Sequence, residues 1–214
     1  MIVIASYNNS DFLKSILVSL RAHSTQQHTI LVVETSETDG SGEIANNFSA
    51  AYHQSPGCYD TGAYNYAMLS YPEEPEYFMF QDSLEVVSSD WESIFRIPSQ
   101  NKKFVGLRKF DFSSTGYYDD YIGNQMYRKM YNRDFSYTNG VVGPNFYLPN
   151  YMANKLLNYG SYQFNPINKD QARGMERVWA NLAYDCDGIA FTEDYTGHEI
   201  GYEKYIIKHY GGRQ

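Results

Sequence analysis

Three short apolar runs in the amino-terminal part of the chain are each followed directly by polar side chains. In order, these are residues 2–6 with Tyr7 and Asn8, residues 31–33 with Glu34, and residues 77–80 with Gln81, Asp82 and Ser83. Such runs are typical of strands that are buried on both faces. In an open parallel sheet the carboxyl ends of the strands line one crevice. We therefore expect Tyr7, Glu34 and Asp82 to surround one ligand, in the manner of a nucleotide pocket.

Patterns typical of helices lie between these strands. Turn and capping residues at 8–11 precede apolar residues at helical spacing, and a polar loop at 36–42 precedes a short helix. Residues 50–53 form a weaker strand pattern, and residues 61–69 a further helix. Alternation of strands and helices with short loops predicts an α/β fold, with a mostly parallel sheet flanked by helices and right-handed crossovers.

The second half of the chain is less regular. Strands are expected at 104–107 and 141–148, and helices at 151–159 and 175–185. Residues 112–136 are polar, rich in tyrosine and irregular, so we expect a mobile loop or flap there. No repeat or convincing linker divides the chain, which predicts a single domain over residues 1–214.

The net charge of -8 and the sequence pI near 5.1 argue against nucleic acid, whose binding depends on neutralising phosphates. An anionic ligand would need a local source of positive charge, such as a divalent cation or a helix N-terminus. Cys58 and Cys186 have neither a disulfide framework nor metal-ligand spacing. No apolar run has the length of a transmembrane segment. We therefore expect a cytoplasmic protein, either free or peripherally attached to a membrane.

Tyrosine is unusually frequent, with 22 residues in the chain. Aromatic faces stack on sugar rings and bases while the phenol hydroxyl stays in water. The composition therefore suits contact with carbohydrate or nucleotide, and it equally suits amphipathic side chains in a core.

Four motifs follow one another in the order found in a known enzyme family. Val3-Ile4-Ala5-Ser6-Tyr7-Asn8 fits V-I-x-x-Y-N, and Val32-Val33-Glu34 stands where the family has V-V-D before a D-G-S-x-D-G-T loop. Residues 60–67, with Gly62 and Asn65, echo N-x-G-x-x-x-A-x-N, and Gln81-Asp82-Ser83 takes the place of the D-x-D metal motif with a single Asp. The sequence resembles the GT-A glycosyltransferases, in particular the inverting transferases of family 2.

The resemblance covers roughly residues 1–190, because residues 143–149 and 174–177 stand where the family has a G-x-x-x-x-x-R segment and a G-E-D segment. It implies a nucleotide-sugar-binding half at about residues 1–100 and an acceptor-binding half at about residues 101–214.

The resemblance implies a nucleotide diphosphate sugar donor, with a UDP-sugar favoured. Tyr7 and Asn8 would contact the base or ribose, although the same residues also suit a capped turn. Glu34 would accept a hydrogen bond from a base N–H or a ribose hydroxyl. The implied donor-binding residues are Tyr7, Asn8, Glu34, Gly62, Asn65, Gln81, Asp82 and Ser83.

The implied cofactor is Mn²⁺ or Mg²⁺ bound to Asp82, because a hard divalent ion stabilises the charge that grows on a departing diphosphate. The alternative for Asp82 is a solvated loop carboxylate. Glu85 would assist through a water molecule. Some GT-A transferases use a late histidine as a metal ligand, which makes His209, and then His198, candidates.

The implied general base is Glu176, which would take the proton from the acceptor hydroxyl as the hydroxyl attacks C1 of the sugar. The alternative is an ion pair with Arg177 at a helix surface. Asp119 and Asp120 are fallback bases. We expect Trp179, three residues after Glu176, to lie behind it in the core.

The function expected from these residues is transfer of a sugar to a hydroxyl of a glycan or glycoprotein, with inversion. A nucleotidyltransferase is a rival, but that class usually has a glycine-rich, basic loop after the first strand, and residues 7–10 contain neither glycine nor lysine. A second rival is a noncatalytic sugar- or nucleotide-binding module whose D-x-D motif has decayed.

Overall fold

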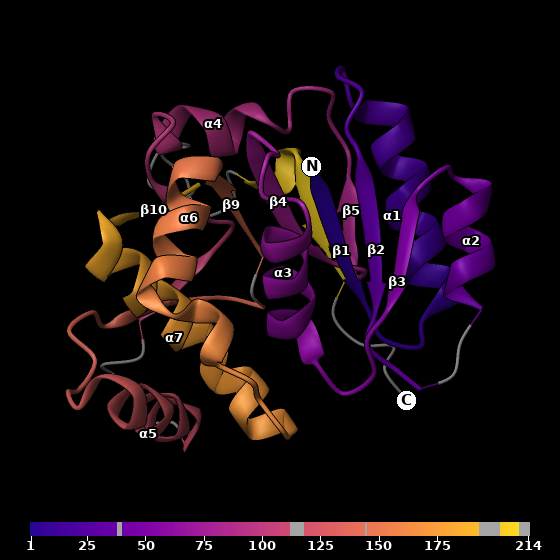
Figure 1. The fold of residues 1–214 in the computed structure, drawn as a ribbon. Coiled ribbons are helices and arrows are strands. Elements are labelled where there is room, and N and C mark those ends of the chain that lie inside the picture. Colours follow the sequence, from indigo (N-terminus) through magenta and orange to yellow (C-terminus); the bar gives the residue numbers. More distant parts are fainter. Residues whose placement is uncertain (38–39, 112–117, 144, 193–201, 210–214) are drawn as a thin grey trace.

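A seven-stranded sheet forms the centre of the protein in a computed structural model, which describes residues 1–37, 40–111, 118–143, 145–192 and 202–209 (Figure 1). The strand order is β10-β6-β9-β4-β1-β2-β3. The bounds are β1 Ile2–Ser6, β2 Ile30–Glu34, β3 Ala51–Gln54, β4 Glu76–Gln81, β6 Phe104–Gly106, β9 Phe146–Pro149 and β10 Ile189–Phe191. Only β9 runs antiparallel to its neighbours. The expected α/β fold with a mostly parallel sheet is confirmed.

Helices cover both faces of the sheet, as Figure 1 shows. One face packs against α1 Ser10–His23, α2 Ser41–Asn47 and α4 Ser93–Ser99. The other face packs against α3 Tyr59–Ser70, α5 Tyr118–Tyr131, α6 Asn150–Tyr159 and α7 Lys169–Cys186. Alternate residues of β1 explain the two layers, because Ile2 and Ile4 join the first core and Val3 and Ala5 the second.

The segment at 141–148, expected to be one strand, is divided between two sheets. β8 Asn139–Val141 pairs with β7 Lys109–Asp111, whereas β9 belongs to the central sheet. Gly143 lies between them with φ +51°, a left-handed conformation that extended chain does not adopt. The strand therefore ends before this glycine and a new one begins after it.

The irregular loop expected at 112–136 is largely a helix, α5, which packs on α7. Tyr127 on α5 is completely buried, and its ring centroid lies 5.2 Å from that of Phe135. Tyrosine supplies the buried surface here, and a pattern that counts tyrosine as polar misses such a helix. Residues 112–117 lie outside the described part of the chain.

A further two-stranded sheet joins the end of the described chain to the carboxyl end of β4, the middle strand of the central sheet. β5 Leu84–Val86 follows directly after β4, and β11 Ile206–Lys208 pairs with it in antiparallel fashion. The short 3₁₀ helix Tyr202–Lys204 precedes β11, and another, Ser161–Gln163, follows α6. None of the helices among the described residues has the length and hydropathy needed to span a membrane.

Candidate active site

Three strand ends meet at the carboxyl edge of the sheet. The parallel register places Ser6 beside Glu34 and Ala5 beside Gln81. The segments that follow β1, β2 and β4 therefore start side by side, as the order of the apolar runs predicts. Two carboxylates, Asp82 and Glu34, then fix the loops that follow these strands through hydrogen bonds.

Asp82 is buried, with 1% of its surface exposed. Its Oδ2 accepts hydrogen bonds from Ser6 Oγ at 3.3 Å and from the Tyr7 backbone N–H at 3.2 Å. Its own N–H donates to the Ala5 carbonyl at 3.1 Å. The alternative of a solvated loop carboxylate is therefore wrong, because Asp82 ties the end of β4 to the end of β1.

Glu34 is completely buried and holds two loops. Its Oε1 accepts hydrogen bonds from the backbone N–H groups of Asn8 at 3.1 Å and Ser36 at 2.8 Å, and its Oε2 accepts one from Ser41 Oγ at 2.9 Å. Asn8 has a left-handed φ of +48°, so this bond fixes an uncommon turn. The contacts observed for Glu34 position the loop, and its direct contact with a nucleotide stays a prediction.

Tyr7 lies on the loop that Asp82 and Glu34 hold. Its side chain is 49% exposed, although its backbone N–H is bonded to Asp82. An exposed aromatic ring on a fixed backbone is suited to stacking with a base or sugar. Asn8 beside it is also exposed, whereas Asn9 caps α1 by accepting a hydrogen bond from Phe12 N–H at 3.2 Å.

Gln81 and Ser83, on either side of Asp82, bind groups that the sequence pattern does not identify. Gln81 Nε2 donates to Asp60 Oδ2 at 2.6 Å. Lys208 Nζ donates to Gln81 Oε1, and to Ser83 Oγ at 2.6 Å. Asp60 lies in the first turn of α3, inside a motif already recognised, whereas Lys208 comes from β11 and no local pattern marks it.

Glu176 on α7 reaches the same edge through the turn at Gly143. Its Oε1 accepts a hydrogen bond from Gly143 N–H at 3.0 Å. A Cβ atom added at Gly143 would lie 3.0 Å from Gln81 Oε1 and 3.6 Å from the Cε of Lys208. Glu176, Gln81 and Lys208 therefore surround one glycine. Asn145, which follows this turn, accepts a hydrogen bond from Gln81 N–H at 2.8 Å.

Arg177 links Glu176 to one of the fallback bases. It donates through Nη1 to Glu176 Oε2 at 3.0 Å and through Nε to Asp120 Oδ1 at 2.5 Å, and it is itself 5% exposed. The ion pair with Arg177 is thus present, but it lies in a partly buried cluster rather than on an open helix surface. Trp179 is completely buried, as expected. The side chain of Asp119 lies outside the described part of the structure.

Gly62 and Asn65 both lie on α3, and each is in contact with other groups of the protein. A Cβ atom added at Gly62 would lie 2.4 Å from the Cβ of Cys58, so the helix needs glycine there. Asn65 is 6% exposed, and its amide donates to the Ser161 carbonyl at 3.1 Å and accepts from Ser161 Oγ at 3.3 Å. Contact of either residue with a donor stays a prediction.

The side chains expected to bind Mn²⁺ or Mg²⁺ form contacts with other residues of the protein. His209 Nε2 lies 2.8 Å from Glu85 Oε2, and Asp82 is bonded to Ser6 and Tyr7. Within the described residues, no three His, Cys, Asp or Glu side chains gather in a way that could hold a metal ion. Divalent cations of this kind prefer several oxygen ligands. The described side chains therefore do not by themselves form a multi-ligand site for such a cation. His198 lies outside the described residues.

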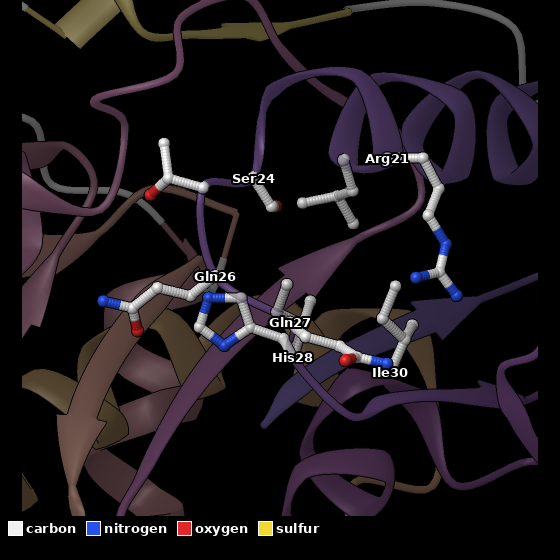
Figure 2. A pocket seen from close by; sticks show the side chains of 9 residues that line it. Arg21, Ser24, Gln26, Gln27, His28 and Ile30 are labelled. Carbon is white, nitrogen blue, oxygen red and sulfur yellow. The ribbon is translucent and has the colours of Figure 1, made fainter.

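A cavity of about 240 Å³ lies at the opposite edge of the sheet (Figure 2). Its lining includes Ile2 and Ile30, the first residues of β1 and β2, together with Arg21 and His28. His28 Nε2 is 2.8 Å from Glu92 Oε1. This cavity adjoins the amino ends of the strands and is separate from the site around Asp82.

Comparison with solved structures identifies the fold, whereas no family model and no curated protein matches the sequence. The chain is similar to a 1–349 fragment of TarS from S. aureus, with a TM-score of 0.57, 12% identity and coverage of 96% of this chain and 59% of the fragment. It therefore spans about three fifths of the TarS fragment. TarS has also been solved in complex with UDP.

Two further structures have the same architecture. One is glucosyl-3-phosphoglycerate synthase from Mycobacterium tuberculosis with Mn²⁺, UDP and glucosyl-3-phosphoglycerate, at a TM-score of 0.51, 11% identity, and coverage of 89% of this chain and 68% of the synthase. The other is a cytidylyltransferase from Leptospira borgpetersenii, at a TM-score of 0.51, 13% identity, and coverage of 89% and 74%. The chain shares its GT-A fold with TarS and with the synthase.

Proposed function

We propose that this protein is a glycosyltransferase that moves a sugar from a nucleotide diphosphate sugar, with a UDP-sugar favoured, to a hydroxyl of a glycan or glycoprotein. The observation that carries the proposal is the carboxyl edge of the sheet, where buried Asp82 and Glu34 fix the loop of an exposed Tyr7. Ligands bind at this edge in open α/β sheets. The UDP complex of a protein with the same fold supports the choice of donor.

On the donor side, the chain itself supplies a stacking surface and a fixed backbone. Tyr7 would pack against the base or ribose, and Asn8 lies beside it on the same held turn. Because Asp82 and Glu34 are bonded before any ligand arrives, the loop needs little further ordering on binding. The M. tuberculosis synthase of the same fold was solved with Mn²⁺, whereas the described residues of this chain contain no group of three His, Cys, Asp or Glu side chains that could hold a metal ion.

On the acceptor side, Glu176 would act as general base. Both of its oxygens accept hydrogen bonds, from Gly143 N–H and Arg177, as suits an ionised carboxylate. In an inverting transfer, the acceptor oxygen attacks C1, the C1–O bond to the diphosphate breaks, and Glu176 takes the hydroxyl proton. Its hydrogen bond from Gly143, a residue that lies beside Gln81, supports this role.

The decisive experiment is donor hydrolysis and transfer over a panel of UDP, GDP, TDP and CMP sugars, each with Mn²⁺ and with EDTA. We expect release of a nucleoside diphosphate from one class of donor, increased by a glycan acceptor. Binding of a sugar nucleotide without turnover under any condition would instead identify a noncatalytic module.

A nucleotidyltransferase is the second candidate, because the Leptospira cytidylyltransferase shares the fold. Against it, residues 7–10 contain neither glycine nor lysine to bind a triphosphate after β1. Release of pyrophosphate from a nucleoside triphosphate and a sugar phosphate would favour this candidate over the transferase.

A further inference from the structure

A lysine contacts the residues on both sides of Asp82, the residue expected to bind the metal ion. β11 pairs with β5 so that Lys208 lies opposite Leu84, two residues after Asp82. His209 N–H then donates to the Ser83 carbonyl at 2.9 Å, which continues this contact past the strand. The pairing therefore fixes the backbone of Lys208 beside the residues that follow β4.

The ammonium group of Lys208 binds both neighbours of Asp82. It donates to Gln81 Oε1 and to Ser83 Oγ, and the latter distance is 2.6 Å. A D-x-D motif would place carboxylates in this segment to hold a divalent cation. Here the two positions are neutral acceptors, which match a singly charged donor better than a cation that needs several anionic ligands.

The carboxylates at the carboxyl edge of the sheet also favour a cation near the diphosphate. Asp60 is bonded to Gln81 at 2.6 Å, and Glu176 contacts the turn at Gly143 beside Lys208. In a chain of net charge -8, a diphosphate would meet these carboxylates unfavourably without a positive group among them. An ammonium ion is a compact charge that binds phosphate oxygens well.

We propose that Lys208 binds the diphosphate of the donor and stabilises the departing nucleotide, in the role that a divalent metal was expected to play. The inference rests on the proposed function. In the transfer, the electron pair of the broken C1–O bond ends on the diphosphate oxygen, the acceptor proton passes to Glu176, and Lys208 offsets the new negative charge. The reaction balances without a further reactant.

The first experiment measures UDP and uridine binding by calorimetry in EDTA, for the wild type and Lys208→Gln. We expect the wild type to bind UDP without metal. Lys208→Gln should weaken UDP binding by about 10- to 100-fold, as for loss of a charged hydrogen bond, and leave uridine binding unchanged. Lys204→Gln is the matched control, because it removes the same charge from an exposed residue of the same segment and should bind like the wild type.

The second experiment uses the wild-type protein, so it does not depend on the folding of a variant. An amine-directed acylating reagent is applied in EDTA, and the modified lysines are identified by mass spectrometry. We expect UDP to slow modification of Lys208, uridine to have no such effect, and Lys204 to react equally in all samples.

The outcomes separate the inference from the proposed function. UDP binding that requires Mn²⁺, with no protection of Lys208, overturns the role of Lys208 and leaves the transferase standing. Absence of binding to UDP, GDP, TDP and CDP, with or without Mn²⁺, overturns both.

Discussion

At the scale of single residues, Glu176 is the side chain whose role is most directly open to test. Its carboxylate is held by Gly143 and Arg177, and the side chain is 21% exposed, so a glutamine can occupy the same position. We expect Glu176→Gln to lower transfer by roughly 10²- to 10⁴-fold, because the proton acceptor is lost. UDP affinity, measured by calorimetry, should stay the same.

The control for Glu176→Gln is Asp120→Asn, which removes the fallback base that also contacts Arg177. Near-normal transfer by Glu176→Gln, together with a large loss in Asp120→Asn, would transfer the role to Asp120.

Gly62 offers a test of whether a motif residue acts through the ligand or through packing. Glycine to alanine in a helix normally stabilises by up to about 1 kcal/mol. At Gly62 the added Cβ would lie 2.4 Å from that of Cys58, so we expect a loss of about 1–3 kcal/mol in unfolding free energy. The double variant Cys58→Gly/Gly62→Ala should recover part of that loss in chemical denaturation. Additive losses would contradict the packing explanation.

Several residues of the candidate site are predictable from the sequence because they end a strand or directly follow one. Glu34 is the last residue of β2, Tyr7 and Asp82 follow β1 and β4, and the parallel register brings the three strand ends to one edge. Burial of Asp82 and the bonds of Glu34 are not predictable, since they depend on neighbouring loops. Lys208 is still less so, because its position depends on pairing between segments far apart in the chain.

At the scale of elements, α5 is the main difference from the sequence pattern, and a single glycine explains how closely it packs. A Cβ added at Gly123 would lie 2.7 Å from the backbone oxygen of Gly174 on α7. We expect Gly123→Ala to lower the unfolding free energy by about 1–3 kcal/mol, because the opposing atom belongs to a backbone. Gln125→Ala, at an exposed position of the same helix, should change it by less than about 0.5 kcal/mol.

The strands and helices up to the end of β4 are well predicted, because β-branched runs and apolar periods mark them clearly. The rest of the chain is harder for a physical reason. Its helices bury tyrosines such as Tyr127, and β5 and β11 are too short to carry a period of their own. Such elements form because other parts of the fold offer a partner.

At the scale of the whole molecule, a charged cluster connects β4, α4 and β9 at the edge away from the site. Glu76 Oε2 accepts hydrogen bonds from Arg96 Nε at 3.1 Å and Tyr147 OH at 2.9 Å. Burial raises the pKa of Glu76, but the hydrogen bonds from Arg96 and Tyr147 outweigh it and hold the pKa below its ordinary value of 4.5.

A carboxyl whose pKa is lower in the folded state stabilises the fold above its ordinary pKa and loses that contribution as the pH falls. We expect Glu76→Gln to unfold at a lower temperature than the wild type at pH 7. The difference should shrink as the pH drops below 4.5, the ordinary pKa. Thermal unfolding followed by circular dichroism from pH 7 to about 3 measures it. A difference that does not vary with pH would mean that the effect of Glu76 is packing alone.

The pairing of β11 with β5 has a consequence for synthesis on the ribosome. A nascent chain that has emerged through β10 already holds every strand of the central sheet, and with it Tyr7, Glu34, Asp82 and Glu176. Lys208 emerges later, so the folded intermediate would present a cluster of carboxylates without its cation. With the role proposed for Lys208, the site around Asp82 would thus be completed only after the body of the protein has folded.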